Sequence, residues 1–179
     1  AEEARVRARV SSFDGGRFVI ALADRPEEAL VRNEQVHARL DALVQTGELG
    51  GMRSLHDLLW SPELQQRNLD ALRASPELAA RIETAYSEAG FRPGAFAAFA
   101  QSLDSPPPPL TLAELRASPL GALASTLVLD LGGRTAVITY LRGVNDPTRI
   151  RAALDGLPDV HFLEQGAFLN QIAASLAVL

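Results

Sequence analysis

The chain has 179 residues, 47% of them hydrophobic, which is enough apolar material for the core of one domain or of two small, closely packed ones. All 17 basic residues are arginine and 22 residues are acidic, so the net charge of −5 argues against a nucleic-acid partner. The sequence contains no cysteine, which excludes a disulfide framework and any cysteine-ligated metal site.

The first residues, AEEARVRARV, carry charge and lack the apolar run of a signal peptide, so we interpret the chain as cytosolic or as an excised piece of a longer protein. The alternating segment 5–10 and the β-rich segment 17–23 flank Gly15 and Gly16, which predicts a hairpin. The arginines of segment 5–10 then share one face. We expect a solvated edge strand there, with binding of anionic headgroups as the alternative.

A helix is predicted next, because Asp24 can cap it, Pro26 suits its first turn and Glu27 completes a capping pattern. Apolar residues then recur at helical spacing as far as Gly47, where we expect the helix to end. A short strand is expected over residues 52–55.

The segment 127–141 is apolar enough to suggest a membrane span, but a charge and a glycine pair at its centre exclude one. Gly132 and Gly133 instead predict a tight turn between two strands. Both faces of the second strand are apolar, so we expect it to lie centrally in a covered sheet.

The chain then repeats its earlier plan. Asp146 and Pro147 predict a helix start, Gly156 predicts its end, and residues 160–163 read as a strand. The order of hairpin, helix and strand therefore occurs twice. This order predicts an α+β fold of the ferredoxin-like, split β-α-β type with two hairpin-helix-strand halves.

Between the halves the sequence predicts an inserted helical lobe, because Ser-Pro pairs begin at positions 61, 75 and 118 and mark helix starts. The segment SPPPP at 105–109 predicts a stiff extended connector, with a ligand for a proline-recognising partner as the alternative. The expected organisation is a first α/β half over 1–55, a helical lobe over 56–124 and a second α/β half over 125–179, together completing one domain.

The titratable residues form no recognisable catalytic or metal-binding pattern. His37, His56 and His161 lack a metal-ligand spacing, and the glycine pairs lack the patterns that bind phosphate. The acidic residues gather at predicted helix starts, where capping and the helix dipole account for them. The sequence therefore predicts neither an enzyme nor a metal or cofactor site.

Aromatic residues gather at Trp60, Phe91, Phe96 and Phe99 of the predicted lobe. Phenylalanines at helical spacing with alanines between them are typical of a buried core seam. The alternative is an apolar ligand groove, which an exposed patch would favour. These four residues are the candidate ligand-binding residues.

Six segments carry a resemblance: RFVIALADRPEEAL, LDALVQTGELGGMRSL, FRPGAFAAFAQSL, LTLAELRASPLGAL, TAVITYLRGVNDP and LPDVHFLEQGA. Together they cover nearly the whole chain, and FRPGAF, SPLGAL and LRGVNDP are the most specific. Their order and spacing resemble the second large extracytoplasmic loop of predicted exporters in the resistance-nodulation-division superfamily, near the mycobacterial-membrane-protein-large type. None of them is a catalytic signature.

The resemblance implies a porter domain on the periplasmic side of a bacterial inner membrane, in an exporter driven by proton flow through membrane helices outside this chain. Its partners would be those helices and the other extracytoplasmic loop, and its cargo a fatty acyl lipid, a glycolipid or a polyene pigment. A path between two α/β halves would change width as they shift. The ends of such a loop lie near each other to meet the adjoining membrane helices.

A hypothesis of another class is a free-standing periplasmic binding or adaptor module, which recognises a protein or lipid partner and transports nothing. Hydrophobic segments on both sides of this region in its gene would favour the exporter, whereas a short gene with its own secretion signal would favour the module. In the exporter, a final helix over residues 168–176 would lead toward the membrane.

Overall fold

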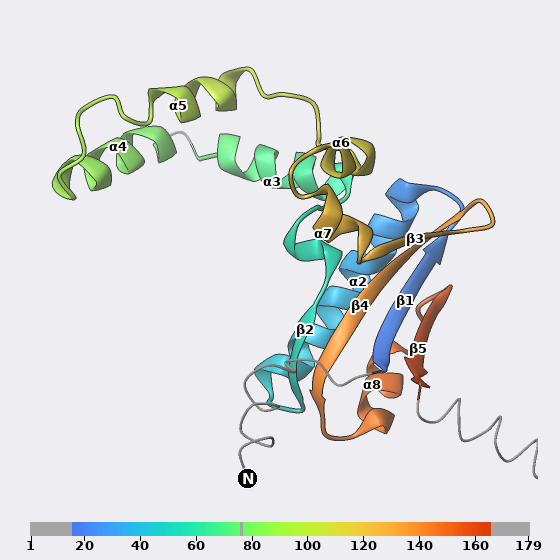
Figure 1. Ribbon diagram of the computed structural model, residues 1–179. Coiled ribbons are helices and arrows are strands. Elements are labelled where there is room, and N and C mark those ends of the chain that lie inside the picture. Colours follow the sequence, from blue (N-terminus) through green and yellow to red (C-terminus); the bar gives the residue numbers. More distant parts are fainter. Residues whose placement is uncertain (1–15, 76, 166–179) are drawn as a thin grey trace, which may run out of the picture. The chain divides into compact units, whose positions relative to one another are not determined.

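The structure is a computed structural model that describes residues 16–75 and 77–165 (Figure 1). The chain divides into two compact units. The first, which we call the sheet unit, contains the described residues up to Ser61 and from Leu112 onward. The second, which we call the helical unit, is Pro62–Thr111.

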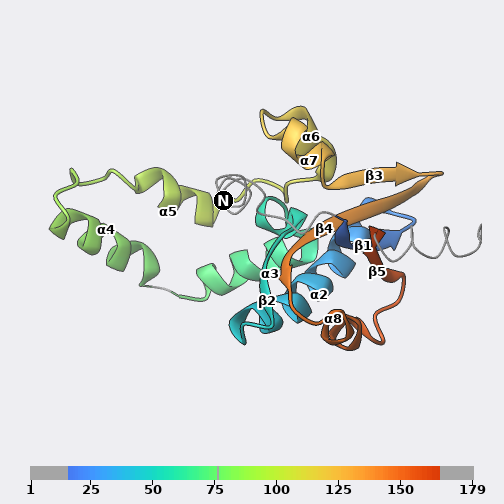
Figure 2. The ribbon, with the colours of Figure 1, turned by 60° about the horizontal axis from the view of Figure 1, so that its bottom comes forward.

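The sheet unit is built on one antiparallel sheet of five strands. These are β1 (Arg17–Ala23), β2 (Leu49–Arg53), β3 (Val128–Leu131), β4 (Arg134–Val144) and β5 (Val160–Glu164). Four strands follow the order β2-β4-β1-β5, and β3 pairs with β4 (Figure 2). The β-α-β unit that runs from β1 to β2 is split, because β4 lies between these two strands. The unit that runs from β4 to β5 is split by β1 in the same way. The predicted α+β fold with split β-α-β elements is confirmed.

The two predicted halves interleave within this sheet. Phe18 of β1 pairs with Tyr140 of β4, and Arg17 of β1 pairs with Glu164 of β5. The expectation of a path whose width changes as the two halves shift is therefore wrong, because one half cannot shift against the other without breaking main-chain hydrogen bonds of the sheet.

Both edges of β1 are paired, since this strand lies between β4 and β5. The sequence predicts a hairpin in which segment 5–10 pairs with β1. Segment 5–10 itself lies outside the described residues, as does the helix predicted over 168–176.

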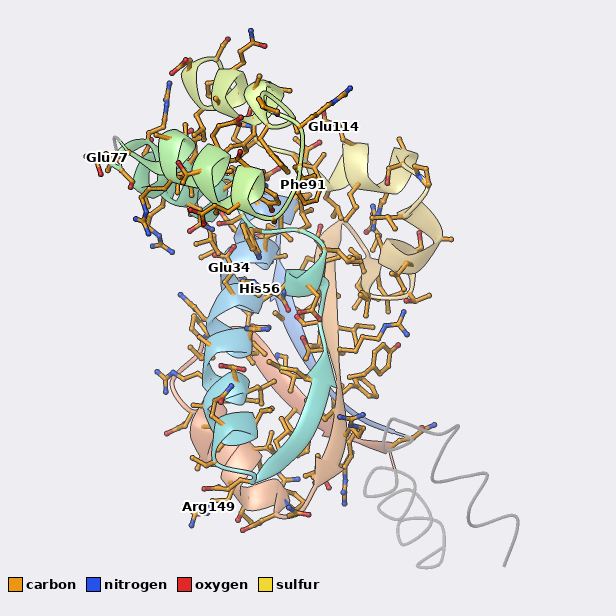
Figure 3. All side chains as sticks on the ribbon, turned by 90° about the vertical axis from the view of Figure 1, so that its left-hand side faces the viewer. Glu34, His56, Glu77, Phe91, Glu114 and Arg149 are labelled. Carbon is orange, nitrogen blue, oxygen red and sulfur yellow. The ribbon has the colours of Figure 1, made fainter. Side chains whose placement is uncertain are left out.

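Helix α2 (Pro26–Gln45) covers one face of the sheet together with the shorter helix α8 (Pro147–Leu154) (Figure 3). The buried residues of α2 recur at helical spacing and are Ala29, Leu30, Asn33, Val36 and Leu40. Gly47 ends this helix at a φ of 75°, as predicted. β2 then begins at Leu49, earlier than the expected strand at 52–55.

The prediction that Asp24 caps α2 is wrong. Arg25 occupies the cap position, and its side chain makes no capping hydrogen bond. The carboxylate of Asp24 instead accepts a hydrogen bond from Nε of Arg134 on β4, at 3.0 Å. A long-range ion pair thus replaces the local cap that the sequence favours.

Two local predictions in the second half are confirmed. Gly132 and Gly133 form the turn between β3 and β4 with φ values of 63° and 88°, which glycine adopts without strain. Helix α8 (Pro147–Leu154) begins at the predicted cap, where Asp146 Oδ1 accepts a hydrogen bond from the Thr148 N–H at 2.8 Å. The hydrogen bonds from the side chain and backbone of Thr148 lower the pKa of Asp146.

Three short helices complete the sheet unit: η1 (Leu55–Asp57), α6 (Leu112–Ala117) and α7 (Gly121–Ser125). All three fall within residues 56–124 or at their edge, the range expected for the helical lobe. Leu112, Leu115 and Ala124 are nevertheless buried in one core cluster with residues of the sheet. The compact helical unit is consequently shorter at both ends than the expected lobe.

A polar cluster lies inside the core of the sheet unit, where Asn33, Ser54 and Thr139 are each 1% exposed. The hydroxyls of Ser54 and Thr139 each lie 3.1 Å from Asn33 Oδ1. These hydrogen bonds join α2, β4 and the residue after β2, and they offset the cost of burying polar groups.

The helical unit contains α3 (Pro62–Arg73), α4 (Leu78–Glu88) and α5 (Ala97–Asp104). None of these helices has a buried residue. Across residues 16–75 and 77–165, no helix is both long enough and apolar enough to cross a membrane.

Candidate functional site

A groove of about 380 Å³ in the helical unit is lined by α3, α5 and the proline segment that follows α5. Its apolar lining includes Leu69 and Leu72 of α3, Phe99 of α5 and the run of prolines from Pro106 to Pro109. The predicted connector therefore forms one wall of the groove. Four consecutive prolines hold an extended backbone, so this wall is stiff before any ligand binds.

Gln65 fixes the end of the proline segment against α3. Its side-chain Nε2 donates to the carbonyl of Leu110 at 2.9 Å, and its Oε1 accepts from the N–H of the same residue at 2.8 Å. This pair of hydrogen bonds satisfies both backbone groups of one residue in a segment without regular structure. The groove is consequently preformed, which lowers the entropic cost of filling it.

An aromatic cluster lies at the turn between α4 and α5 and consists of Tyr86, Phe91 and Phe96. The ring centroid of Tyr86 is 5.2 Å from that of Phe91 and 3.8 Å from that of Phe96. Phe91, labelled in Figure 3, is 51% exposed even though it contacts both other rings. The exposed patch that would favour an apolar binding surface over a core seam is therefore present.

The structure brings together three of the four candidate residues. Phe91 and Phe96 contact each other, and Phe96 and Phe99 line a smaller cavity of about 230 Å³ against Ile82 of α4. Trp60 belongs to the sheet unit and is 41% exposed, with its ring 6.1 Å from that of His56. The prediction treated Trp60 as part of the same lobe.

The sequence did not identify Tyr86 as part of the aromatic cluster. It also did not identify the prolines and the leucines of α3 as the lining of the groove. Leu69 and Leu72 are three residues apart, so the sequence could have predicted that they share one apolar face of a helix. Which side of α3 faces α5 depends on packing, and no local pattern reports it.

The described residues contain no group of three or more histidine, aspartate or glutamate side chains placed to hold a metal ion. Two histidines do meet in the sheet unit, since the ring centroids of His37 and His56 are 4.1 Å apart. The third, His161, is exposed on β5.

No protein-family model, curated protein or solved structure matches the chain. The groove of the helical unit is open, has one stiff wall and has few polar groups. These features suit the binding of an apolar ligand. Gln65 and Gln66 are the amide side chains of the groove lining.

Proposed function

We propose that the chain is the extracytoplasmic porter domain of a proton-driven bacterial inner-membrane exporter of the resistance-nodulation-division superfamily. Its cargo is lipid-like or amphipathic: a fatty acyl lipid, a glycolipid or a polyene pigment. The observation that carries the proposal is the helical unit, whose helices bury no residue and which lines a groove with leucines, prolines and Phe99. An acyl or polyene chain fits such a lining.

The path of the chain through the sheet unit supports the same proposal. Gly16 precedes β1, Gln165 follows β5, and the N–H of Gln165 donates to the carbonyl of Gly16 at 2.7 Å. The described chain thus enters and leaves this unit at neighbouring points. A domain inserted between two membrane helices needs this arrangement.

The interleaved sheet changes how such a porter would work. Since β1 is paired with β4 and β5, the sheet unit behaves as one rigid body. Cargo passage would then depend on shifts of this body against the membrane helices and the other extracytoplasmic loop.

Topology labelling tests the proposal. The chain has no cysteine, so Glu88→Cys, at an exposed position on α4, gives the only thiol in this region. In bacteria that express the complete gene product, a membrane-impermeant maleimide should label this thiol in intact cells, and the protein should stay in the membrane after alkaline extraction. Labelling only after lysis would contradict the proposal, and release by alkali would favour the free-standing module.

Lipid binding gives a second test. Native mass spectrometry of the 179-residue chain with palmitate should show binding in the micromolar range or weaker, because an exporter's other half-site is missing. A tight, one-to-one complex would instead identify a lipid carrier, the binding module of the alternative hypothesis.

A further inference from the structure

Residues 54–61, which we call the exit segment, lead the chain out of the sheet unit. Helix α2 holds both ends of this segment. At its start, Asn33 Oδ1 accepts a hydrogen bond from Ser54 Oγ at 3.1 Å. At its end, the carboxylate of Glu34 accepts hydrogen bonds from the N–H and the hydroxyl of Ser61, at 2.5 and 3.1 Å.

Between these ends, His37 of α2 faces His56 of η1, with the ring planes 36° apart (Figure 3 labels His56 and Glu34). His56 is half-buried, and its Nδ1 atom is buried without a hydrogen-bond partner among the described residues. If both rings were protonated, two positive charges would lie on rings whose centroids are 4.1 Å apart. The N–H at Nδ1 of His56 would also have no acceptor among the described residues. The contact therefore favours the neutral form of His56.

The carboxylates of α2 and η1 do not compensate both protons. Oδ1 of Asp57 lies 3.8 Å from Nε2 of His37, so it can balance a proton on that ring. Glu34, one turn before His37, is already hydrogen-bonded to Ser61. His56 is left without a carboxylate at hydrogen-bond distance.

The charged and titratable groups of β2 and β4, the strands next to this segment, have partners elsewhere in the sheet unit. Arg53 donates to Thr126, Arg142 to the carbonyl of Gly50, Tyr140 to the carbonyl of Thr126, and Arg134 to Asp24 and Asp159. Hydrogen bonds thus occupy these groups away from the two histidines.

We propose that His37 and His56 form a proton-sensitive latch, which fastens the exit segment to α2 near neutral pH and releases it in mildly acidic solution. Such a device would regulate a segment of the sheet unit, and it is independent of the proposed export function.

Burial, and next the neighbouring His37, lower the pKa of His56 below its ordinary value of 6.5, and Asp57 opposes this only in part. A lowered histidine pKa means that the closed latch favours the neutral ring. Its stabilisation is present above pH 6.5 and is lost as the pH falls below that value, because the released ring takes up a proton first.

Hydrogen–deuterium exchange of the 179-residue chain at pH 7.5 and pH 5.5 tests the latch, with rates corrected for the pH dependence of chemical exchange. The reporters are the hydrogen-bonded amides of Leu58, Leu59 and Ser61. For an opening that takes up one proton, their exchange should accelerate by up to about tenfold per pH unit below the ordinary histidine pKa. Amides of β1 should keep their protection at both pH values.

Three variants identify the proton acceptor. His56→Phe keeps an aromatic ring that cannot be protonated, so the exit segment should stay protected at pH 5.5. His161→Phe, which changes the exposed histidine of β5, should leave the acceleration as in the wild type. Glu34→Gln should also retain it, and its disappearance there would assign the effect to the carboxylate and overturn the proposal.

The wild-type chain provides a measurement that does not depend on whether the variants fold. In an NMR titration, the ring protons of His56 should titrate with a midpoint below 6.5. A midpoint at or above this value, or equal protection of the exit segment at both pH values, would refute the latch.

Discussion

The sheet unit and the helical unit use their apolar residues in opposite ways. Every buried hydrophobic residue of the described chain lies in the sheet unit, whereas α3, α4 and α5 bury none. The helices of the helical unit have 12, 11 and 8 residues, lengths at which helices are marginal in water without tertiary packing. The described residues therefore place their buried apolar side chains in the sheet unit and leave the apolar side chains of α3, α4 and α5 partly or fully exposed.

The largest effect should come from a core leucine of the sheet unit. Leu40 on α2 is 0% exposed, so Leu40→Ala should lower the free energy of unfolding by about 3–4 kcal/mol through lost burial and the cavity left behind. Urea unfolding, followed by the fluorescence of the single tryptophan, measures the change. The matched variant Leu72→Ala, 41% exposed on α3, should cost less than about 1 kcal/mol. Equal costs would mean that the helical unit has a core of its own.

The buried polar cluster should rank second. Asn33→Ala removes the acceptor that the hydroxyls of Ser54 and Thr139 share, and should cost about 2–3 kcal/mol because buried polar groups lose their partner. Thr139→Val, which keeps the side-chain volume, serves as control and should cost about 1 kcal/mol. If Asn33→Ala had the same midpoint of urea unfolding as the wild type, water would have to replace the amide without a change in the free energy of unfolding.

A smaller effect is expected at a helix cap. Asp146 caps α8 of the sheet unit, whereas α4 and α5 lack a side-chain cap. Asp146→Ala should lower the thermal midpoint at pH 7. The pKa of Asp146 is lowered in the fold, so its stabilisation is present above the ordinary value of 3.8 and is lost as the pH falls through the lower, folded value. A difference between variant and wild type that grows on acidification would contradict this account.

The smallest effect on stability belongs to the exposed aromatic surface. Phe91→Ser should change the free energy of unfolding by less than about 0.5 kcal/mol, since the ring is half exposed. It should nevertheless reduce the fluorescence of an apolar dye such as anilinonaphthalene sulfonate. Leu131→Ser, at a position 48% exposed on β3, is the control and should leave dye binding unchanged. If both variants lost the same amount of dye fluorescence, the aromatic cluster would not differ from the exposed part of β3 in dye binding.

Sequence reasoning succeeded where a few neighbouring residues decide the structure. Gly132 with Gly133 specify a turn, and Asp146 with Pro147 specify a helix start, because the required backbone angles and hydrogen bonds lie within three or four residues. The repeated order of strands and helices then restricted the fold to a split β-α-β sheet. Phe91, Phe96 and Phe99 are clustered in the sequence, and the structure also brings them together.

The tertiary structure decided everything that depends on a distant partner. Asp24 left its expected cap for Arg134, 110 positions away, and β1 took β4 and β5 as neighbours. Packing likewise assigned α6 and α7 to the sheet unit and left Phe91 exposed. The physical reason is that local backbone preferences act over a few residues, whereas strand pairing and burial are settled by competition among all segments of the chain for one core.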